Sequence, residues 1–321
     1  MRLLVASPIH ADALSSLQLE HDVRLAIGAP EAELAAAARD REAIIFRSGV
    51  TIGAEALAAP GLRLLVRAGS GLDNLDLELV TRRGIELQRI PGPGAQAVAE
   101  LTFGLMLGLA RGIVHADRQL QAGHWIKSEL VGYNLRGKRL GIVGLGSIGI
   151  RVAQLGLAWG MRPIGCVDHP TDERRSAFAA MGIDLVDFDA VLAEGDFVTV
   201  HVPLGSTTRN LIGAAELARM KAGAYLVNIA RGGVVDETAL REALVPRGHL
   251  RGAALDVHIA EGEGKVSPLA DLPNVILTPH IGAQTIDAQE EIGREIVSII
   301  RRFSGTREDP SAMTQTDGTP A

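Results

Sequence analysis

A glycine-rich segment that follows an apolar run constrains this chain more than any other feature. Residues 144–149 read GLGSIG, so Gly144, Gly146 and Gly149 form a G-x-G-x-x-G pattern between the strand candidate LGIVG and a helical stretch. In such a unit the first glycine permits a tight turn, the second lets the backbone approach a pyrophosphate, and the third allows close helix–strand packing. The segment therefore predicts a βαβ unit that binds a dinucleotide, with Ser147 and Ile148 in the phosphate-binding turn.

An acidic residue follows this pattern at the expected interval. Asp168 ends the next strand candidate, RPIGCVD at 162–168, about 20 residues after the glycines. A carboxylate there would accept hydrogen bonds from the ribose hydroxyls and repel a 2′-phosphate, which favours NAD over NADP. The alternative is a structural glycine turn followed by a surface aspartate.

Strand and helix patterns alternate along the chain in two series. The first series has strand candidates at 3–7, 23–27, 43–48, 62–69 and 85–89, and the second at 140–144, 162–168, 184–188, 197–202, 224–230, 250–257 and 275–280. Alternation of this kind predicts parallel strands joined by crossover helices. We therefore expect an α/β fold with two doubly wound parallel-sheet domains, a Rossmann domain being inserted into a flavodoxin-like one.

The expected domain boundaries follow from the helical stretches. One long helix is predicted at about 95–123, and an amphipathic helix at 284–303 has no strand after it, so it is expected to return to the first domain. We assign 1–94 and 283–304 to the first domain and 95–282 to the nucleotide domain. Residues 305–321 are polar and rich in Pro and Gly, which predicts a disordered tail.

Composition excludes several classes of protein. The net charge is −6 with both signs interspersed, which argues against a nucleic-acid partner. The single cysteine, Cys166, excludes an intrachain disulfide and a cysteine-rich zinc site, and no metal site is expected. The N-terminal apolar run is too short for a secretory signal, and LTFGLMLGLA at 101–110 is too short to cross a membrane. We expect a soluble, cytoplasmic protein.

Charged residues follow several of the later strand candidates. Arg231, Asp256 and His280 each lie at a predicted strand end, and Glu261 follows in the next loop. Open α/β sheets bind their ligands at the carboxyl ends of the strands. A histidine can exchange the proton of a substrate hydroxyl, a carboxylate can stabilise its charged form, and an arginine can hold a substrate carboxylate. Together they indicate a dehydrogenase, although charged residues at strand ends often only cap loops.

These segments, with VRAGSGLDNLD at 66–76, resemble the D-specific 2-hydroxyacid dehydrogenase family from about residue 40 to 303. The motifs are most similar to those of D-3-phosphoglycerate dehydrogenases. The resemblance implies that His280 is the acid/base, Glu261 its partner, and Arg231 the residue that binds the substrate carboxylate and polarises its carbonyl.

The resemblance also implies roles around the cofactor and the acid. Asp256 would contact the nicotinamide amide, His201 in the HVPL motif would line the cofactor while serving a structural purpose, and the Ser70–Gly71 backbone N–H groups would bind the substrate carboxylate. In the family the inserted domain binds NAD, the other domain is the substrate-binding lid with the active site in the cleft between them, and two chains pair through their nucleotide domains.

Some positions depart from the family pattern. Family members usually carry an aromatic residue where this chain has His258, and a proline where it has Gly262. Ungapped counting places Glu261 at the catalytic position, with Glu263 as the alternative if the loop is shifted. His258 is interpreted as a packing or surface substitution. Where the family has Asn-Thr-Pro, this chain has an arginine, an isoleucine and a proline at 89–91.

Three arginines give an indication of the substrate. Arg47, Arg67 and Arg89 lie at or near the ends of strands in the first domain, and Arg47 and Arg67 resemble the phosphate-side residues of phosphoglycerate dehydrogenases. They favour a 2-hydroxy acid with a second anionic group, a phosphate or a carboxylate, unless they point to solvent. Two alternatives remain: a hydroxypyruvate or glyoxylate reductase, and an NAD-responsive, corepressor-like binding module.

Overall fold

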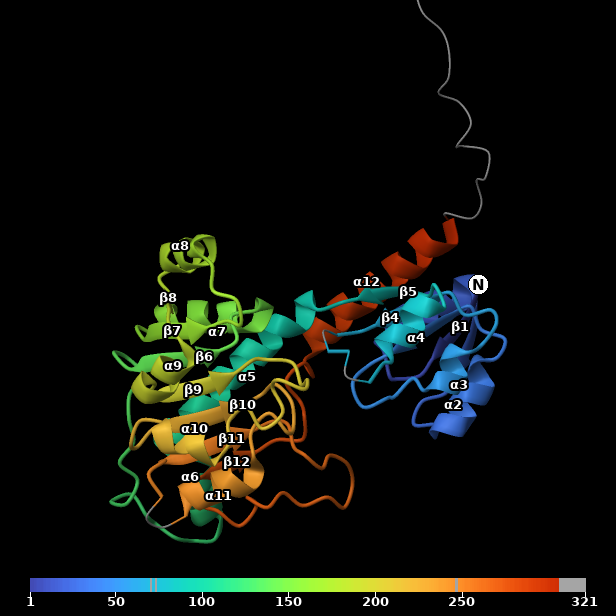
Figure 1. The fold of residues 1–321 in the computed structure, drawn as a ribbon. Coiled ribbons are helices and arrows are strands. Elements are labelled where there is room, and N and C mark those ends of the chain that lie inside the picture. Colours follow the sequence, from blue (N-terminus) through green and yellow to red (C-terminus); the bar gives the residue numbers. More distant parts are fainter. Residues whose placement is uncertain (70, 73, 246–247, 306–321) are drawn as a thin grey trace, which may run out of the picture. The chain divides into compact units, whose positions relative to one another are not determined.

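The computed structural model divides the chain into two compact units (Figure 1). It describes residues 1–69, 71–72, 74–245 and 248–305. Unit 1 comprises Met1–Gly94 and the segment that begins at Thr285, and unit 2 comprises Ala95–Gln284. Unit 1 is therefore discontinuous in sequence, and unit 2 is inserted into it.

Unit 1 contains a five-stranded parallel sheet in the order β2-β1-β3-β4-β5, which is the flavodoxin-like order. Its strands are β1 (Arg2–Val5), β2 (Asp22–Leu25), β3 (Ala43–Phe46), β4 (Leu64–Arg67) and β5 (Glu86–Arg89). Its helices are α1 (Ala11–Glu20), α2 (Glu31–Ala38), α3 (Ala54–Leu57), α4 (Leu77–Arg82) and α12 (Ile286–Gly305).

Helices cover both faces of this sheet (Figure 1). Successive strand residues point to opposite faces. Leu3 and Ile45 belong to the core that also contains residues of α1 and α12, whereas Leu4 and Ile44 belong to the core that contains residues of α2, α3 and α4. Burial on both faces explains why the central strands are continuous apolar runs.

Unit 2 contains a seven-stranded parallel sheet in the order β12-β11-β10-β9-β6-β7-β8. Its strands are β6 (Arg139–Val143), β7 (Arg162–Cys166), β8 (Asp184–Leu185), β9 (Phe197–Val200), β10 (Tyr225–Asn228), β11 (Gly252–Leu255) and β12 (Val275–Leu277). Its helices are α5 (Gly92–Arg111, which begins at the unit boundary), α6 (Ile113–Gln121), α7 (Ser147–Ala158), α8 (Asp172–Ala180), α9 (Phe188–Glu194), α10 (Ala214–Arg219) and α11 (Glu237–Leu244). The sheet grows from β6 first toward β7 and β8 and then, on the other side, toward β9 to β12, so the strand order reverses at β6, as in a Rossmann fold. The predicted fold class is confirmed.

Two local predictions are wrong. The single helix expected at 95–123 is two helices, because Gly112 adopts a left-handed conformation (φ 61°) and the pair bends by 63°. The strand expected at 184–188 stops at Leu185, because the Asp187 carboxylate accepts the Ala190 N–H at 2.7 Å and caps α9. Within the described ranges, no single helix is long and apolar enough to cross a membrane, and only the bent α5–α6 pair passes by length and composition.

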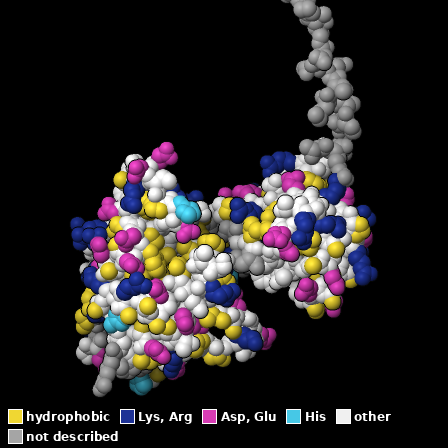
Figure 2. Space-filling view, in the orientation of Figure 1, with side chains coloured by type: hydrophobic (Ala, Val, Ile, Leu, Met, Phe, Trp, Pro, Cys, Tyr) yellow, Lys and Arg dark blue, Asp and Glu magenta, His cyan; other side chains and the backbone are white. Residues whose placement is uncertain are grey.

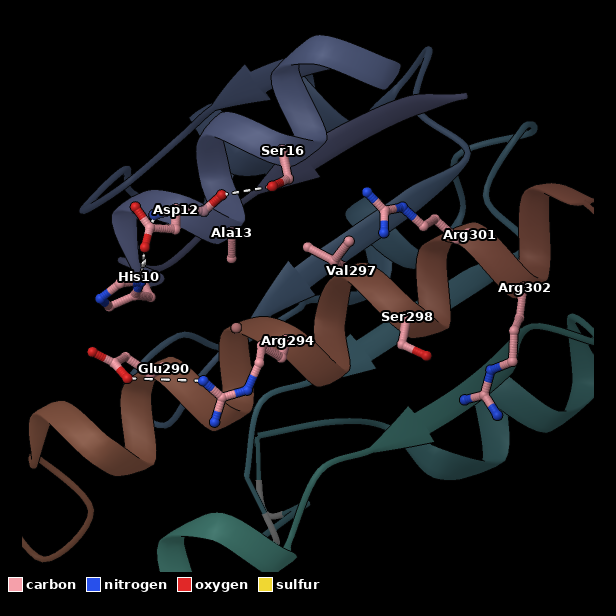
Figure 3. A pocket seen from close by; sticks show the side chains of 11 residues that line it. His10, Asp12, Ala13, Ser16, Glu290, Arg294, Val297, Ser298, Arg301 and Arg302 are labelled. Atoms are coloured by element: carbon pink, nitrogen blue, oxygen red, sulfur yellow. Dashed lines mark hydrogen bonds and ion pairs between the residues drawn. The ribbon is translucent and has the colours of Figure 1, made fainter.

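Charges of both signs are interspersed on the face seen in Figure 2. A groove of about 600 Å³ lies between α1 and α12 of unit 1, where Gly293 lets the helices approach closely (Figure 3). Two of the three arginines that line this groove have acidic neighbours: Arg301 Nε donates to Glu20 Oε2 at 3.0 Å, and Arg294 lies 3.8 Å from Glu290. The groove therefore does not have the unpaired cations expected of an anion-binding site.

Candidate active site

The glycine turn follows β6, the strand at which the strand order of the unit 2 sheet reverses. It connects β6 to α7, and the Gly144 N–H donates to Cys166 O at the end of β7. Gly144 has φ 99°, and a Cβ on it would lie 2.8 Å from His201 O. A Cβ on Gly149 would lie 2.1 Å from Gly144 O, so these two positions require glycine for close packing.

Gly146 serves a different purpose from the other two glycines. A Cβ on it would meet nothing within 4 Å, so protein packing does not require glycine there. Gly146 is also the N-cap of α7 and makes no side-chain cap hydrogen bond. Ser147 and Ile148 begin the helix. The turn therefore presents backbone N–H groups to open space at a helix N-terminus, which is the arrangement that receives a phosphate.

Two further predicted cofactor residues lie beyond the ends of β7 and β9, the strands on either side of β6. Asp168 is exposed, two residues beyond the end of β7. His201 follows β9, and its ring Nε2 lies 2.9 Å from Thr199 Oγ1. Burial lowers the pKa of His201 to about 3, so the ring is neutral at physiological pH. A neutral, enclosed ring beside the glycine turn suits packing better than proton transfer.

A carboxylate and an imidazole meet at the ends of β11 and β12. His280 Nδ1 lies 2.9 Å from Glu261 Oε2, and Glu261 Oε1 accepts the His258 N–H at 3.2 Å. The structure thus brings Glu261 to His280, whereas Glu263 only lines the same cavity of about 620 Å³. Burial on its own would raise the pKa of Glu261, but the hydrogen bonds and charges of His280 and His258 together leave that pKa lowered. Contact through Nδ1 leaves His280 Nε2 for a substrate.

The His280 backbone is strained and firmly held. Its φ of 54° is in the left-handed region, which is uncommon for a residue with a side chain. Its N–H donates to Asp256 O at 2.8 Å. The Asp256 carboxylate, 1% exposed, accepts from Thr278 Oγ1 at 2.6 Å and from the N–H groups of Ile281 and Gly282 at 2.9 Å each. Strain of this kind collects at functional sites.

Arg231 and His258 complete the surroundings of the pair. Arg231 follows β10 and is half-buried, and its Nη1 donates to Ala230 O at 2.7 Å. His258 Nε2 lies 2.9 Å from Thr278 O, while its Nδ1 is buried and has no hydrogen-bond partner among the described residues. The ring therefore connects the loop of Glu261 to the segment that leads to His280.

Unit 1 carries the predicted substrate residues at one edge of its sheet. Arg47 lies just beyond β3, is half-buried, and donates from Nη1 to Gln289 Oε1 at 2.8 Å. Burial lowers the pKa of Arg47. Arg67 is 3% exposed, and its guanidinium donates to the carbonyls of Gly71 and Ala68 at 2.8 and 3.1 Å. Arg89 is exposed at the end of β5, and Ser70 lies outside the described residues.

Two contributors were missed by sequence reasoning. Gln289 reaches Arg47 from α12, 242 residues away. Glu237, the first residue of α11, accepts the Ile259 N–H at 2.7 Å from within the core. Glu237 lies six residues after Arg231, and that proximity is the only signal the sequence offers.

Comparison with known proteins finds relatives in sequence and in fold. Residues 103–282 match the family model described as D-isomer specific 2-hydroxyacid dehydrogenase, NAD binding domain. The chain is 40% identical over 304 residues to a D-3-phosphoglycerate dehydrogenase of Methanocaldococcus jannaschii, which covers 94% of this chain and 57% of that protein. The chain thus spans little more than half the length of such relatives.

Other relatives are of similar length to this chain. A hydroxypyruvate reductase of Thermotoga maritima is 40% identical over 267 residues, covering 82% of this chain and 85% of that protein. The crystal structure of a D-lactate dehydrogenase from Aquifex aeolicus, complexed with NAD and lactic acid, superposes with a TM-score of 0.82 at 29% identity, covering 95% of this chain and 96% of that one.

Proposed function

This chain belongs to the D-isomer specific 2-hydroxyacid dehydrogenase family, with an NAD-binding domain, and we propose that it transfers hydride between NAD(H) and a D-2-hydroxy acid or its 2-keto acid. The observation that carries the proposal is the 2.9 Å contact between His280 and Glu261 in the unit that holds the glycine turn. NAD supplies the hydride acceptor or donor when bound. Gly144, Gly146 and Asp168 would hold its pyrophosphate and ribose.

The proton chemistry is assigned to the His280–Glu261 pair. In keto-acid reduction, protonated His280 donates from Nε2 to the oxygen that develops into an alkoxide. Glu261, ionised because its pKa is lowered, stabilises the imidazolium through Nδ1 before that transfer. Arg231 would bind the substrate carboxylate with its guanidinium and polarise the carbonyl. Asp256 is proposed to reach the nicotinamide amide as well as to hold the His280 turn, and His201 to line the cofactor.

The substrate is proposed to carry a second anionic group. Arg47 supports this, because it is a half-buried cation whose hydrogen-bonding partner Gln289 is neutral, and no carboxylate pairs with it among the described residues. Withdrawing a cation partly from water without a counter-ion is costly, and a bound anion would remove that cost. Arg67 is less suited to direct contact, since its guanidinium holds the loop that contains Gly71. That loop, with Ser70, is proposed to bind the substrate carboxylate through its N–H groups.

The test is NADH oxidation with 3-phosphohydroxypyruvate, hydroxypyruvate, glyoxylate, oxaloacetate, 2-ketoglutarate and pyruvate, repeated with NADPH. We expect a preference for a doubly anionic acid with NADH, and an Arg47→Ala variant that raises KM for that acid while leaving hydroxypyruvate turnover unchanged. A preference for glyoxylate or hydroxypyruvate would instead indicate a reductase of small keto acids. Absence of turnover with every acid would favour the binding-module alternative.

His280→Ala tests the chemical assignment separately. We expect kcat to fall by a factor on the order of 10² or more while the NADH dissociation constant changes little, since general acid–base catalysis contributes that much. Full activity in this variant would refute the role.

The protein is further proposed to form a homodimer through unit 2. Large apolar side chains are exposed between residues 113 and 131: Ile113 is 53%, Leu120 60%, Trp125 79% and Val131 85% exposed. Clustered exposed apolar residues of this kind mark association sites. Sedimentation equilibrium should give twice the chain mass, and a Trp125→Glu, Val131→Glu double variant should sediment as a monomer. A monomeric wild type would exclude the proposal.

A further inference from the structure

Glu237 is a buried acidic residue that the mechanism above does not use. It is 4% exposed at the first position of α11, and no cation pairs with it in the part of the chain that the structure describes. Burying a carboxylate without an ion pair is unfavourable by several kcal/mol unless hydrogen bonds compensate. The helix N-terminus favours its charge, and the Ile259 N–H donates to Oε1 at 2.7 Å.

The group that Glu237 binds lies in the loop of the candidate catalytic carboxylate. Ile259 is two residues before Glu261, and its own side chain is 61% exposed, so apolar packing does not fix this part of the loop. The backbone of His258 next to it lies directly against Gly232, where a Cβ would come within 1.9 Å of His258 O. The turn that carries Arg231 and the loop that carries Glu261 are therefore docked together, and Glu237 supplies a hydrogen bond across that contact.

The loop then continues into the proton-transfer pair. Glu261 Oε1 accepts the His258 N–H at 3.2 Å and Oε2 contacts His280 Nδ1 at 2.9 Å. A shift of Ile259 would move His258 and Glu261, which lie on either side of it in the loop. Misplacement by about 1 Å can cost on the order of 10² in rate.

We propose that Glu237 is a positioning residue: it fixes the Ile259 amide so that Glu261 is held against His280. The proposal rests on the function proposed above. It assigns Glu237 no contact with substrate or cofactor, and its whole effect on turnover passes through Glu261.

The experiment compares Glu237→Ala, which removes the acceptor, with Glu237→Gln, which retains an acceptor oxygen. Glu242→Ala is the matched control, because Glu242 is exposed on the same helix. We expect Glu237→Ala to lower kcat by about 10- to 100-fold with the NADH dissociation constant unchanged, and the other two variants to behave like the wild type. If the alanine variant does not bind NADH, Glu237→Met, which is closer in volume, replaces it.

A double-mutant cycle separates positioning from general destabilisation. If Glu237 acts through Glu261, its substitution should have little further effect on kcat in a Glu261→Gln background. An equal loss in both backgrounds, or wild-type kcat in Glu237→Ala, would overturn the proposal.

Hydrogen exchange gives a readout that does not depend on turnover. Glu237→Ala should speed exchange in the peptide that covers residues 258–263, and Glu237→Gln should not. If the wild type turns over no acid, the proposed function fails, but this difference would still establish that Glu237 holds the loop. Unchanged exchange in Glu237→Ala would reject the positioning role whatever the activity.

Discussion

Replacing Asp256 with asparagine should destabilise unit 2 by an amount that follows from three hydrogen bonds. If Oδ1 keeps its bonds to Thr278 and Ile281, the new NH₂ group faces the Gly282 N–H, which loses its acceptor. An unsatisfied buried N–H costs about 1–3 kcal/mol, and the two remaining bonds lose charge assistance worth about 1 kcal/mol together. Removal of a buried charge offsets part of this. The two costs sum to about 2–4 kcal/mol, and we expect a net loss below that sum.

Tryptophan fluorescence during urea unfolding measures this change selectively. The chain has two tryptophans, and both Trp125 and Trp159 lie in unit 2. The matched control is Asp189→Asn, because the Asp189 side chain is 64% exposed and its ion pair with Arg219 should contribute less than about 1 kcal/mol. Turnover of Asp256→Asn should also fall, since the Gly282 N–H in the turn that follows the strained His280 loses its acceptor. An unfolding free energy equal to that of the wild type would refute this account of the His280 turn.

Three further substitutions test the catalytic pair and the glycine turn. The pKa of Glu261 lies below its ordinary 4.5, so the wild-type carboxylate remains a counter-ion at neutral pH and is lost only as the pH falls below that value. Glu261→Gln removes it at every pH, so the decline of keto-acid reduction with rising pH should begin at a lower pH, and an unchanged pH–rate profile would contradict the pairing. Gly149→Ala should unfold more readily, because its Cβ would lie 2.1 Å from Gly144 O, whereas Gly146→Ala should keep wild-type stability and still lose NADH affinity. Calorimetry and NADH titration distinguish the two, and equal stabilities would contradict the packing argument.

Sequence reasoning succeeded where a local pattern specifies the structure. Strand ends could be located because apolar runs stop at charged residues, and the order of the strands then brings Glu261 and His280 together. It failed at Gly112, where the helix breaks. Gly104, Gly108 and Gly112 are spaced by four residues, and only the last takes a positive φ. Gly108 instead lies against Ile276, where a Cβ would come within 2.8 Å. Tertiary packing decides which glycine bends the chain, and that packing cannot be read from a single sequence.

Contacts between distant segments were equally invisible, and they explain what holds the site together. The described buried polar residues of unit 2 are Thr102, Thr199, Asn228, Glu237 and Asp256. Asn228 donates to Arg231 O at 3.0 Å and accepts the Ala230 N–H at 3.2 Å.

The backbone near each of the three candidate catalytic residues is therefore hydrogen-bonded to a buried polar residue. Asn228 fixes the turn of Arg231, Glu237 the loop of Glu261, and Asp256 the turn of His280. The Glu261 and His280 side chains are themselves 40% and 30% exposed, as reacting groups must be, so packing alone cannot fix them. Buried polar groups bind the backbone of these loops instead, and in Asp256 and Glu237 a hydrogen bond to a buried charge is strong enough to hold an irregular segment. Acidic residues are normally expected at the surface, yet Asp256 and Glu237 are buried, because both carboxylates hold the loops that carry the chemistry.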